Sequence, residues 1–296
     1  MVSMSGCTLR SLPRRAYRRS RALRETYREC RFRTRLRFDP QAPELLLSPH
    51  WDDAVLDCWS LLRSELPVTV VNLFAGVPAP GRLAPWDAIT GAADSAVRAR
   101  ERIAEDARAL ASAGRTPLNL PFLDAQYRAA SGAPGLEEID RALSAAVPSA
   151  SRVHAPAGVG GHLDHLLACR YGRMLLRAGL PVTLYADLPY CVLHGWPHWV
   201  DGSEPDPHRN VDAFWLEFLK GVPELPGLRS AHVERLDDTV AAAKLAAMRC
   251  YVTQFSGLDY GAGRPLSDPE IHRFEVRWEL SCGKRRNVKR LTSPAV

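Results

Sequence analysis

Short apolar runs alternate with helix-like stretches along most of this 296-residue chain. Buried strands are predicted where the runs are short and apolar, at residues 44–48, 68–74, 116–122, 152–156 and 182–186. Helices are predicted between them, at residues 52–62, 95–112, 136–146 and 162–178. Because strands that alternate with helices form parallel sheets covered on both faces, the pattern predicts an α/β fold with a doubly wound, mostly parallel sheet.

The periodicity weakens after residue 190. Residues 229–236 predict one more strand, and residues 237–253 predict a helix that Asp237 or Asp238 caps. Residues 76–89 are rich in proline and glycine and predict a long loop.

Two polar clusters follow predicted strands. The sequence SPHWDD at residues 48–53 comes directly after three leucines, and the sequence GGHLDH at residues 160–165 opens a predicted helix. In open α/β sheets, ligands bind outside the carboxyl ends of the strands. We therefore expect the two clusters to meet at this edge and to form one site.

Two histidines and a carboxylate from these clusters match the ligand set of an open catalytic zinc site. Such a site has three protein ligands and leaves one position for water. His50 and Asp53 can face one ion because a helical turn brings residues i and i+3 together, and His165 reaches across as the third ligand. The expected cofactor is one Zn²⁺ per chain, although the same ligands also suit Fe²⁺, Co²⁺ or Ni²⁺.

The other polar residues of the clusters supply the groups that hydrolysis needs. Asp52 is the candidate general base, which takes the proton of the attacking water. His162 lies on the same helical face as His165 and can stabilise the developing oxyanion as an imidazolium or hand a proton to the leaving amine. Asp164 is expected either to orient one of the histidines or to serve only at the start of the helix.

PHWDDA at residues 49–54 and GGHLDH at residues 160–165 resemble the two signatures, PHxDD[EA] and G-x-H-x-D-H, of the PIG-L/LmbE-like N-deacetylases. RIAEDARAL at residues 102–110 is similar to the R-x-x-E-D helix of that family. LDAQYR at residues 123–128 is similar to its loop with a substrate-facing aspartate, and KLAAMRCYVTQ at residues 244–254 to its late helix. The resemblance covers residues 44–280, and the paired signatures are specific, whereas either alone would be weak.

The resemblance implies a Rossmann-like, LmbE-like fold and a mononuclear zinc site. It also implies hydrolysis of an N-acetyl group from a glucosamine-type unit in a glycoside, a glycoconjugate or an antibiotic intermediate. By position it assigns the ligands, the base and the acid or oxyanion partner to the same residues as above: His50, Asp53, His165, Asp52 and His162.

Four further residues are candidates for substrate binding. Trp51 stands where the family has a small or aliphatic residue, and we expect its indole to narrow the pocket or to stack on a sugar ring. Arg102 can reach a substrate phosphate or hydroxyl, although Arg102 and Glu105 are most simply an intrahelical pair on a solvated face. Asp124 can accept from a sugar hydroxyl or serve as a turn residue, and Tyr190 can donate to the carbonyl oxygen.

Residues 191–210 predict a long loop over the mouth of the site. Its histidines, His194, His198 and His208, are spaced too loosely for compact zinc ligation. We therefore interpret the segment as a lid in which Trp196 and Trp199 stack on a sugar.

Charge divides the chain into parts. Residues 1–38 hold twelve arginines and two glutamates, a net charge of +10, whereas the whole chain carries +6, which leaves −4 for the rest. We expect a basic, disordered leader at residues 1–40, an LmbE-like N-deacetylase domain at 41–281 and a basic flexible tail at 282–296. The leader's alternatives are a peripheral contact with acidic lipid or nucleic acid and an organelle transit peptide.

Seven scattered cysteines without CxxC spacing predict reduced thiols and a cytoplasmic location, and no apolar run is long enough to predict a membrane span. The expected function is zinc-dependent hydrolysis of an N-acetyl group from a small-molecule or glycoconjugate amino-sugar substrate, with no nucleic-acid partner. Two alternatives stay open. One is a zinc amidase that acts on a larger N-acyl or thiol-conjugate substrate, and the other is a non-catalytic glycan-binding relative.

Overall fold

The structure is a computed structural model that describes residues 32–128, 132–260 and 265–281. Every described helix and strand belongs to the unit that begins at Thr34. The predicted leader lies outside the described residues as far as residue 31, and the predicted tail at 282–296 lies outside them entirely. The bounds of the three predicted parts therefore stay predictions.

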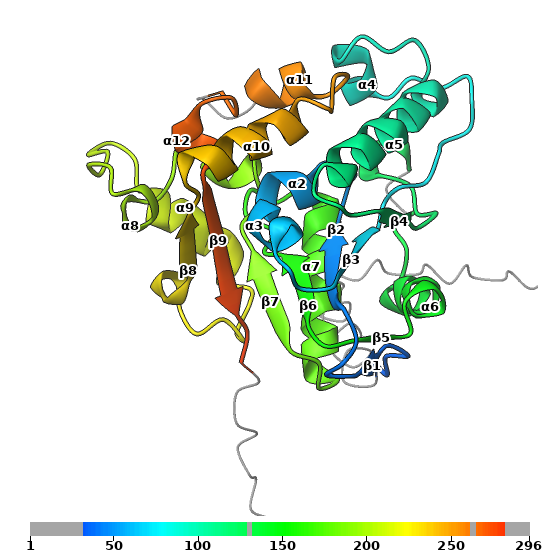
Figure 1. Cartoon of the computed structure of the whole chain (residues 1–296), viewed down its shortest axis with the longest axis horizontal. Coiled ribbons are helices and arrows are strands. Elements are labelled where there is room, and N and C mark those ends of the chain that lie inside the picture. Colours follow the sequence, from blue (N-terminus) through cyan, green and yellow to red (C-terminus); the bar gives the residue numbers. More distant parts are fainter. Residues whose placement is uncertain (1–31, 129–131, 261–264, 282–296) are drawn as a thin grey trace, which may run out of the picture. The chain divides into compact units, whose positions relative to one another are not determined.

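A seven-stranded sheet forms the centre of this unit (Figure 1). In spatial order its strands are β4 (Pro117–Asn119), β3 (Val68–Asn72), β2 (Glu44–Ser48), β6 (Val153–Pro156), β7 (Val182–Tyr185), β9 (Phe274–Glu279) and β8 (His232–Arg235). The first five are parallel to one another, and β9 runs antiparallel to both β7 and β8. A separate parallel pair joins β1 (Arg37–Phe38) to β5 (Ser149–Ala150). The predicted α/β fold with a mostly parallel sheet is confirmed.

Helices lie on both faces of the sheet (Figure 1). They are α2 (Asp53–Asp57), α3 (Trp59–Arg63), α4 (Pro85–Ile89), α5 (Ser95–Ala111), α6 (Leu136–Ala146), α7 (Leu163–Arg177), α8 (His198–Asp201), α9 (Val211–Leu219), α10 (Asp238–Met248), α11 (Phe255–Tyr260) and α12 (Pro269–His272). Three single turns of 3₁₀-helix are η1 (Ala125–Tyr127), η2 (Tyr190–Val192) and η3 (Leu228–Ser230). Helix α10 packs against α2 and α5, whereas α7 packs against β6 and β7.

The strand order contains a reversal that positions the candidate site. From β2 the chain adds β3 and β4 on one side of the sheet, and it then crosses to add β6 and β7 on the other side. The reversal falls between β2 and β6, which pair directly, with Leu46 opposite His154. A crevice opens at the carboxyl ends of the strands at such a point, and it is the usual ligand site of a doubly wound sheet. The two polar clusters follow these two strands in the sequence, one after β2 and the other after β6.

Several predicted elements differ from the structure, among them the helix predicted at residues 237–253, which ends at Met248. The helix predicted at residues 52–62 is interrupted at Cys58, whose φ of −135° and ψ of 35° are not helical. The second half is α3, and a buried carboxylate caps its N-terminus. Glu275 accepts hydrogen bonds from the backbone N–H of Trp59 (2.7 Å) and Ser60 (3.2 Å). The loop predicted at residues 76–89 ends in α4, which begins at Pro85, a residue suited to the first helical turn. The predicted cap of α10 is confirmed, since Asp237 accepts from the N–H of Val240 (2.8 Å).

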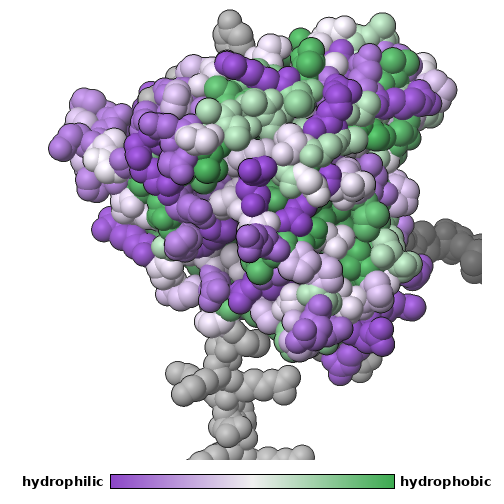
Figure 2. All heavy atoms as spheres, in the orientation of Figure 1, coloured by the Kyte–Doolittle hydropathy of each residue, from purple (hydrophilic) through white to green (hydrophobic). Residues whose placement is uncertain are grey.

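Within the described residues, no helix is both long enough and apolar enough to cross a membrane. On the face drawn in Figure 2, hydrophobic and hydrophilic residues are interspersed and form no continuous apolar band.

A buried ion pair joins α10 to the last strand of the fold. Lys244 Nζ lies 3.0 Å from Glu275 Oε1, and both side chains are fully buried. The same carboxylate also binds the start of α3, so one glutamate on β9 connects three elements that are distant in sequence. Removing one partner of a buried pair leaves an uncompensated charge, which is costly.

We predict that Lys244→Met destabilises the protein by about 3–5 kcal/mol, because the Glu275 carboxylate then stays buried without its cation. The free energy of unfolding from denaturant titration measures the effect. Lys220→Met, at an exposed lysine, is the control and should change it little. The double variant Lys244→Met/Glu275→Gln should recover part of the loss, and a loss no larger than that of Lys220→Met would show that the pair contributes nothing.

Candidate active site

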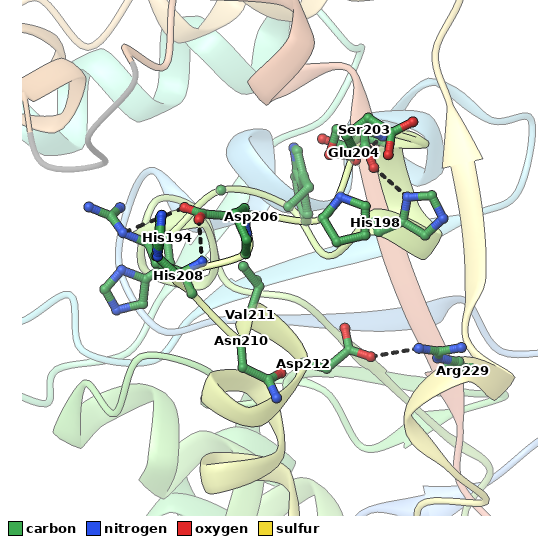
Figure 3. Close-up of a pocket in the computed structure, with 16 residues that line it drawn as sticks. His194, His198, Ser203, Glu204, Asp206, His208, Asn210, Val211, Asp212 and Arg229 are labelled. Atoms are coloured by element: carbon green, nitrogen blue, oxygen red, sulfur yellow. Dashed lines mark hydrogen bonds and ion pairs between the residues drawn. The ribbon is translucent and has the colours of Figure 1, made fainter.

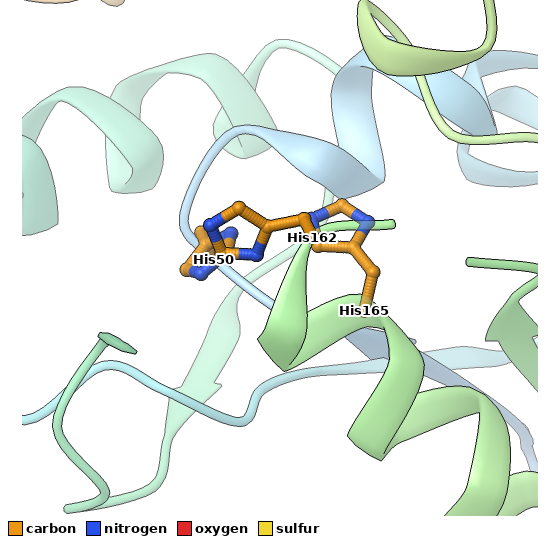
Figure 4. Close-up of side chains that lie close together, drawn as sticks. All are labelled: His50, His162 and His165. Carbon is orange, nitrogen blue, oxygen red and sulfur yellow. The ribbon is translucent and has the colours of Figure 1, made fainter. Parts of the chain in front are cut away.

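Three histidines from the two polar clusters meet at the crevice beside β2 and β6 (Figure 4). His50 follows β2, His162 is the N-cap residue of α7, and His165 lies in the first turn of α7. Their ring centroids are 4.9 to 5.2 Å apart in every pair. The structure thus brings together residues that are more than a hundred positions apart in the sequence.

The carboxylate of Asp53 lies between two of these rings. Its Oδ2 atom is 3.2 Å from His50 Nδ1 and 3.4 Å from His165 Nε2. The ligand atoms of a tetrahedral ion with bonds of about 2.0–2.2 Å are separated by about 3.4 Å. His165 Nε2 is buried and has no hydrogen-bond partner. The two separations from Asp53 Oδ2 therefore match those between ligand atoms on one metal ion.

A carboxylate supports the far nitrogen of each candidate ligand histidine. Asp164 Oδ2 lies 3.2 Å from His50 Nε2, and Asp187 Oδ1 lies 2.9 Å from His165 Nδ1. Metal-bound histidines usually donate their other N–H to such a group, which fixes the tautomer and the ring orientation. Other sets of atoms also converge on His50, among them one with His162 and His165. The set with Asp53 is favoured because both of its histidines have this support.

Two residues of this support were not predicted from the sequence. Asp187 follows β7 at the same edge of the sheet, and it also accepts from the N–H of Val159 (2.9 Å). The rule that drew attention to the ends of β2 and β6 applies equally to β7 and would have found it. Arg128 pairs with Asp164, and its guanidinium lies 5.2 Å from the centre of the Phe74 ring. Arg128 ends the LDAQYR segment, but nothing in the sequence linked it to Asp164, because the contact joins α7 to a loop.

Asp52 lies beside the candidate ligands with its carboxylate directed toward Arg102. Its Oδ1 atom is 3.9 Å from Arg102 Nη2. Burial, reinforced by the negative charge of Asp53, raises the pKa of Asp52 above its ordinary value. A buried carboxylate with a raised pKa is suited to accept a proton near neutral pH.

Arg102 is buried and lines the same cavity as Asp52. Its Nη1 atom is 3.8 Å from Asp124 Oδ2, and its Nε and Nη1 atoms have no hydrogen-bond partner. The prediction of a solvated Arg102–Glu105 pair is wrong. Glu105 is also buried and accepts from the N–H and hydroxyl of Thr253, both at 2.8 Å. Hydrophobic periodicity did not reveal that this face of α5 is buried, because Arg102 and Glu105 are both charged.

His162 and Tyr190 form another wall of the site. Their rings stack with centroids 5.4 Å apart, and His162 Nδ1 accepts from the N–H of Asp164 (3.3 Å). Burial and the nearby His50 and His165 lower the pKa of His162 to about 4. A bound cation would act in the same direction, so the structure favours a neutral His162 that donates from Nε2 over the predicted imidazolium.

Trp51 does not line the cavity, and the prediction that its indole forms a pocket wall is wrong. The ring is fully buried against Ala75, Ala99 and Ile103, and the guanidinium of Arg102 lies 4.7 Å from its centre. His50, Asp52 and Asp53 line the cavity, whereas Trp51 points into the core. The Trp51 ring instead packs against the guanidinium of Arg102.

The prediction that Trp196 and Trp199 stack on a sugar in a lid over the site is also wrong. Trp196 is buried and donates to the carbonyl of Ile271 (3.1 Å), and Trp199 donates to Asp212 (3.1 Å). Both lie near Trp215 rather than over the site. The segment instead lines a different cavity of about 590 Å³, which contains His194, His198 and His208 (Figure 3). From residues 191–210, only Leu193 lines the candidate active-site cavity.

The candidate active-site cavity has a volume of about 330 Å³ and two kinds of lining. The polar lining residues are His50, Asp52, Asp53, Arg102, Asp124, Gln126 and His162. Tyr190, glycine and apolar residues complete the wall. Concave sites of this size with a few convergent polar groups are typical of small-molecule binding.

The sequence relatives of this chain are deacetylases. No family model matches the chain. A 2'-N-acetylparomamine deacetylase of Streptomyces fradiae is 34% identical over 164 residues, which are 49% of this chain and 57% of that protein. A 2'-N-acetylparomamine deacetylase of Niallia circulans is 27% identical over 188 residues, 51% of this chain and 68% of that protein. The match thus spans little more than half the length of the first curated relative.

Solved deacetylases share the fold. A triple mutant of a deacetylase from the teicoplanin biosynthetic pathway has a TM-score of 0.59 and 26% identity, and the match covers 81% of this chain and 98% of that one. The zinc-inhibited form of a teicoplanin deacetylase has a TM-score of 0.58 and 23% identity, covering 80% and 97%. The fold defined here is therefore the LmbE-like deacetylase fold predicted from the sequence.

Gly160 fixes the stacking of Tyr190 on His162. Its φ is +91°, and an added Cβ would lie 2.4 Å from Tyr190 Cβ and 3.1 Å from the Tyr190 carbonyl oxygen. We predict that Gly160→Ala destabilises the protein by about 1–3 kcal/mol more than Gly195→Ala does. Gly195 has a φ of +84° but nothing within 4 Å of its added Cβ, so it controls for backbone strain alone. Equal unfolding free energies for the two variants would refute the packing argument.

Proposed function

We propose that this chain is a metal-dependent N-deacetylase of the PIG-L/LmbE-like family that hydrolyses the N-acetyl group of an amino-sugar substrate. The observation that carries the proposal is the position of Asp53 between His50 Nδ1 and His165 Nε2, at a cavity that also holds Asp52. The names of the sequence relatives support the same chemistry.

His50, Asp53 and His165 would hold the metal, with Zn²⁺ as the preferred ion. When bound, such an ion would polarise the amide carbonyl and lower the pKa of water at its open position. Asp164 and Asp187 would keep the two histidines in the tautomer that presents a lone pair to the ion. A neighbour of the same fold has a zinc-inhibited form, so the amount of zinc must be controlled in any assay.

The remaining residues of the cavity have separate roles in the proposed amide hydrolysis. Asp52 accepts the proton of the attacking water, for which its raised pKa suits it. His162, neutral and a donor at Nε2, stabilises the oxyanion by a hydrogen bond, and Asp52, protonated in the first step, hands that proton to the leaving nitrogen. Tyr190 is a second donor toward the carbonyl oxygen. Arg102, with its unpartnered Nε and Nη1, and Asp124 bind hydroxyl groups of the sugar.

We predict that the purified chain binds about one divalent ion and releases acetate from N-acetylglucosamine glycosides, and that a chelator removes both properties. Metal content by mass spectrometry and an acetate assay measure them, with zinc, cobalt, nickel or ferrous iron restored at one equivalent per chain. Full acetate release from chelated, metal-free protein would refute the metal dependence. Bound metal without release from any N-acetyl sugar would refute the deacetylase.

Two neighbouring carboxylates should have separable roles. We predict that Asp52→Asn lowers kcat about 10²–10⁴-fold and leaves the bound metal unchanged, because it removes only the base. Asp53→Asn should weaken metal binding, because it removes a candidate ligand. Each variant is the matched control of the other, since the two differ by one position and make the same chemical change. Loss of metal in Asp52→Asn with retention in Asp53→Asn would reverse the assignment.

A further inference from the structure

The candidate active-site cavity has an apolar side in addition to its polar residues. Five apolar side chains, called here the apolar wall, belong to Leu56, Trp86, Pro189, Leu193 and Leu258. They come from α2, α4, α11 and the two ends of η2. An unsubstituted amino sugar, which is polar at its edges, would leave much of this wall in contact with water.

The carboxylates of the cavity are already engaged by other groups. Asp53 contacts two histidines, and Asp52 faces Arg102. Asp124 accepts from the backbone N–H (3.0 Å) and side-chain amide (3.1 Å) of Gln126. Among the described residues, no other acidic side chain lines the cavity. An acceptor with several amino groups would therefore meet only carboxylates that already have partners, whereas an apolar group would meet the apolar wall.

Trp86 is the largest member of the wall, and its ring is held in place. Its indole N–H donates to Gln254 Oε1 at 2.6 Å. Gln254 is buried, and its amide nitrogen donates to the carbonyl (3.1 Å) and hydroxyl (3.0 Å) oxygens of Thr253. Because the N–H is engaged, the ring offers the cavity only apolar surface. A half-buried tryptophan fixed in this way is a preformed contact surface, and little side-chain entropy is lost when a ligand packs on it.

Helix α5 connects the two segments that carry this contact. Arg98 donates to the hydroxyl of Thr90 (3.1 Å), at the end of α4, and to the carbonyl of Thr253 (3.0 Å). Gly257, in α11, completes the arrangement from the other side. A Cβ added there would lie 2.9 Å from Trp86 Cη2 and 3.2 Å from Thr90 Cγ2. Only glycine therefore allows the indole to lie against α11 as it does.

We propose that the apolar wall, with Trp86 at its centre, is a subsite for an apolar group carried by the amino-sugar substrate. The inference rests on the proposed deacetylase function and narrows its substrate class to amino sugars with an apolar substituent. The same chemistry has two sources, an apolar aglycone at the anomeric carbon or an acyl chain longer than acetyl. Trp86 and Leu258 determine specificity, and Gln254 and Gly257 are positioning residues that act through Trp86.

Three compounds separate these possibilities when used below their micelle-forming concentrations. They are methyl N-acetyl-β-glucosaminide, its octyl glycoside counterpart, and methyl N-octanoyl-β-glucosaminide. We expect kcat/KM of the metal-loaded protein to be at least about ten-fold higher for one octyl-bearing compound than for the short compound, because burial of a few methylene groups suffices for that factor. The compound that gains identifies the source, and equal values for all three would overturn the proposal.

Substitutions in the wall test whether the gain arises there. Trp86→Ala should bring the ratio of long to short substrate near one, chiefly through KM, while turnover of the short compound changes much less. Gly257→Ala should lower the ratio as well, because its Cβ displaces the indole. Gly227→Ala is the matched control, since its added Cβ meets nothing within 4 Å and its backbone is extended. A ratio unchanged in Trp86→Ala would overturn the proposal.

Binding measurements separate the proposed deacetylase activity from the proposed apolar subsite. Calorimetric titration of the three compounds into Asp52→Asn protein reports affinity without turnover. Tighter binding of an octyl compound, lost when Trp86→Ala is added, supports the subsite even where no compound is hydrolysed, and the absence of turnover then refutes only the deacetylase. Turnover of all three compounds with equal affinities supports the deacetylase and refutes the subsite.

Discussion

The arrangement around one carboxylate, that of Asp53, determines the rest of the site. Asp53 Oδ2 accepts from the backbone N–H of His50 at 2.7 Å and lies close to both candidate ligand histidines. Burial by itself would raise the pKa of Asp53, yet His165 and His50 hold it well below its ordinary value. A buried carboxylate is tolerated only with such partners. The sheet must therefore bring the ends of β2 and β6 together for the cluster to exist.

Helix α5 is the second feature on which the site depends. Its buried face carries Arg98, Arg102, Glu105 and Asp106, four charged residues that contact segments distant from α5 in the sequence. Arg102 enters the polar part of the cavity, whereas Arg98 and Glu105 hold the segment that supports the apolar wall. Asp106 accepts from Asn72 on β3 (2.7 Å), and burial raises its pKa to about 8. One helix thus sets the distance between the reacting groups and the apolar wall.

The central strands and both polar clusters were predictable because their signals are local. A run of leucines that ends in a histidine and two aspartates has few interpretations other than a buried strand that ends at a site. The errors concern side-chain direction. Trp51 and Trp196 are large aromatic residues beside functional ones, and the sequence does not say whether such a ring faces a ligand or the core. Trp86, in a segment predicted to be a loop, is the tryptophan that lines the cavity.

By itself, the sequence determined the alternation of strands and helices, the two clusters and the spacing that places His50 with Asp53. Each of these depends on residues within one turn or one strand, where periodicity is sufficient. Only the tertiary structure decided that Asp187 supports His165, that Arg128 holds Asp164, and that Gly257 lies against Trp86. Such contacts join segments distant along the chain, and they form only when the sheet order and helix packing fix both partners in space.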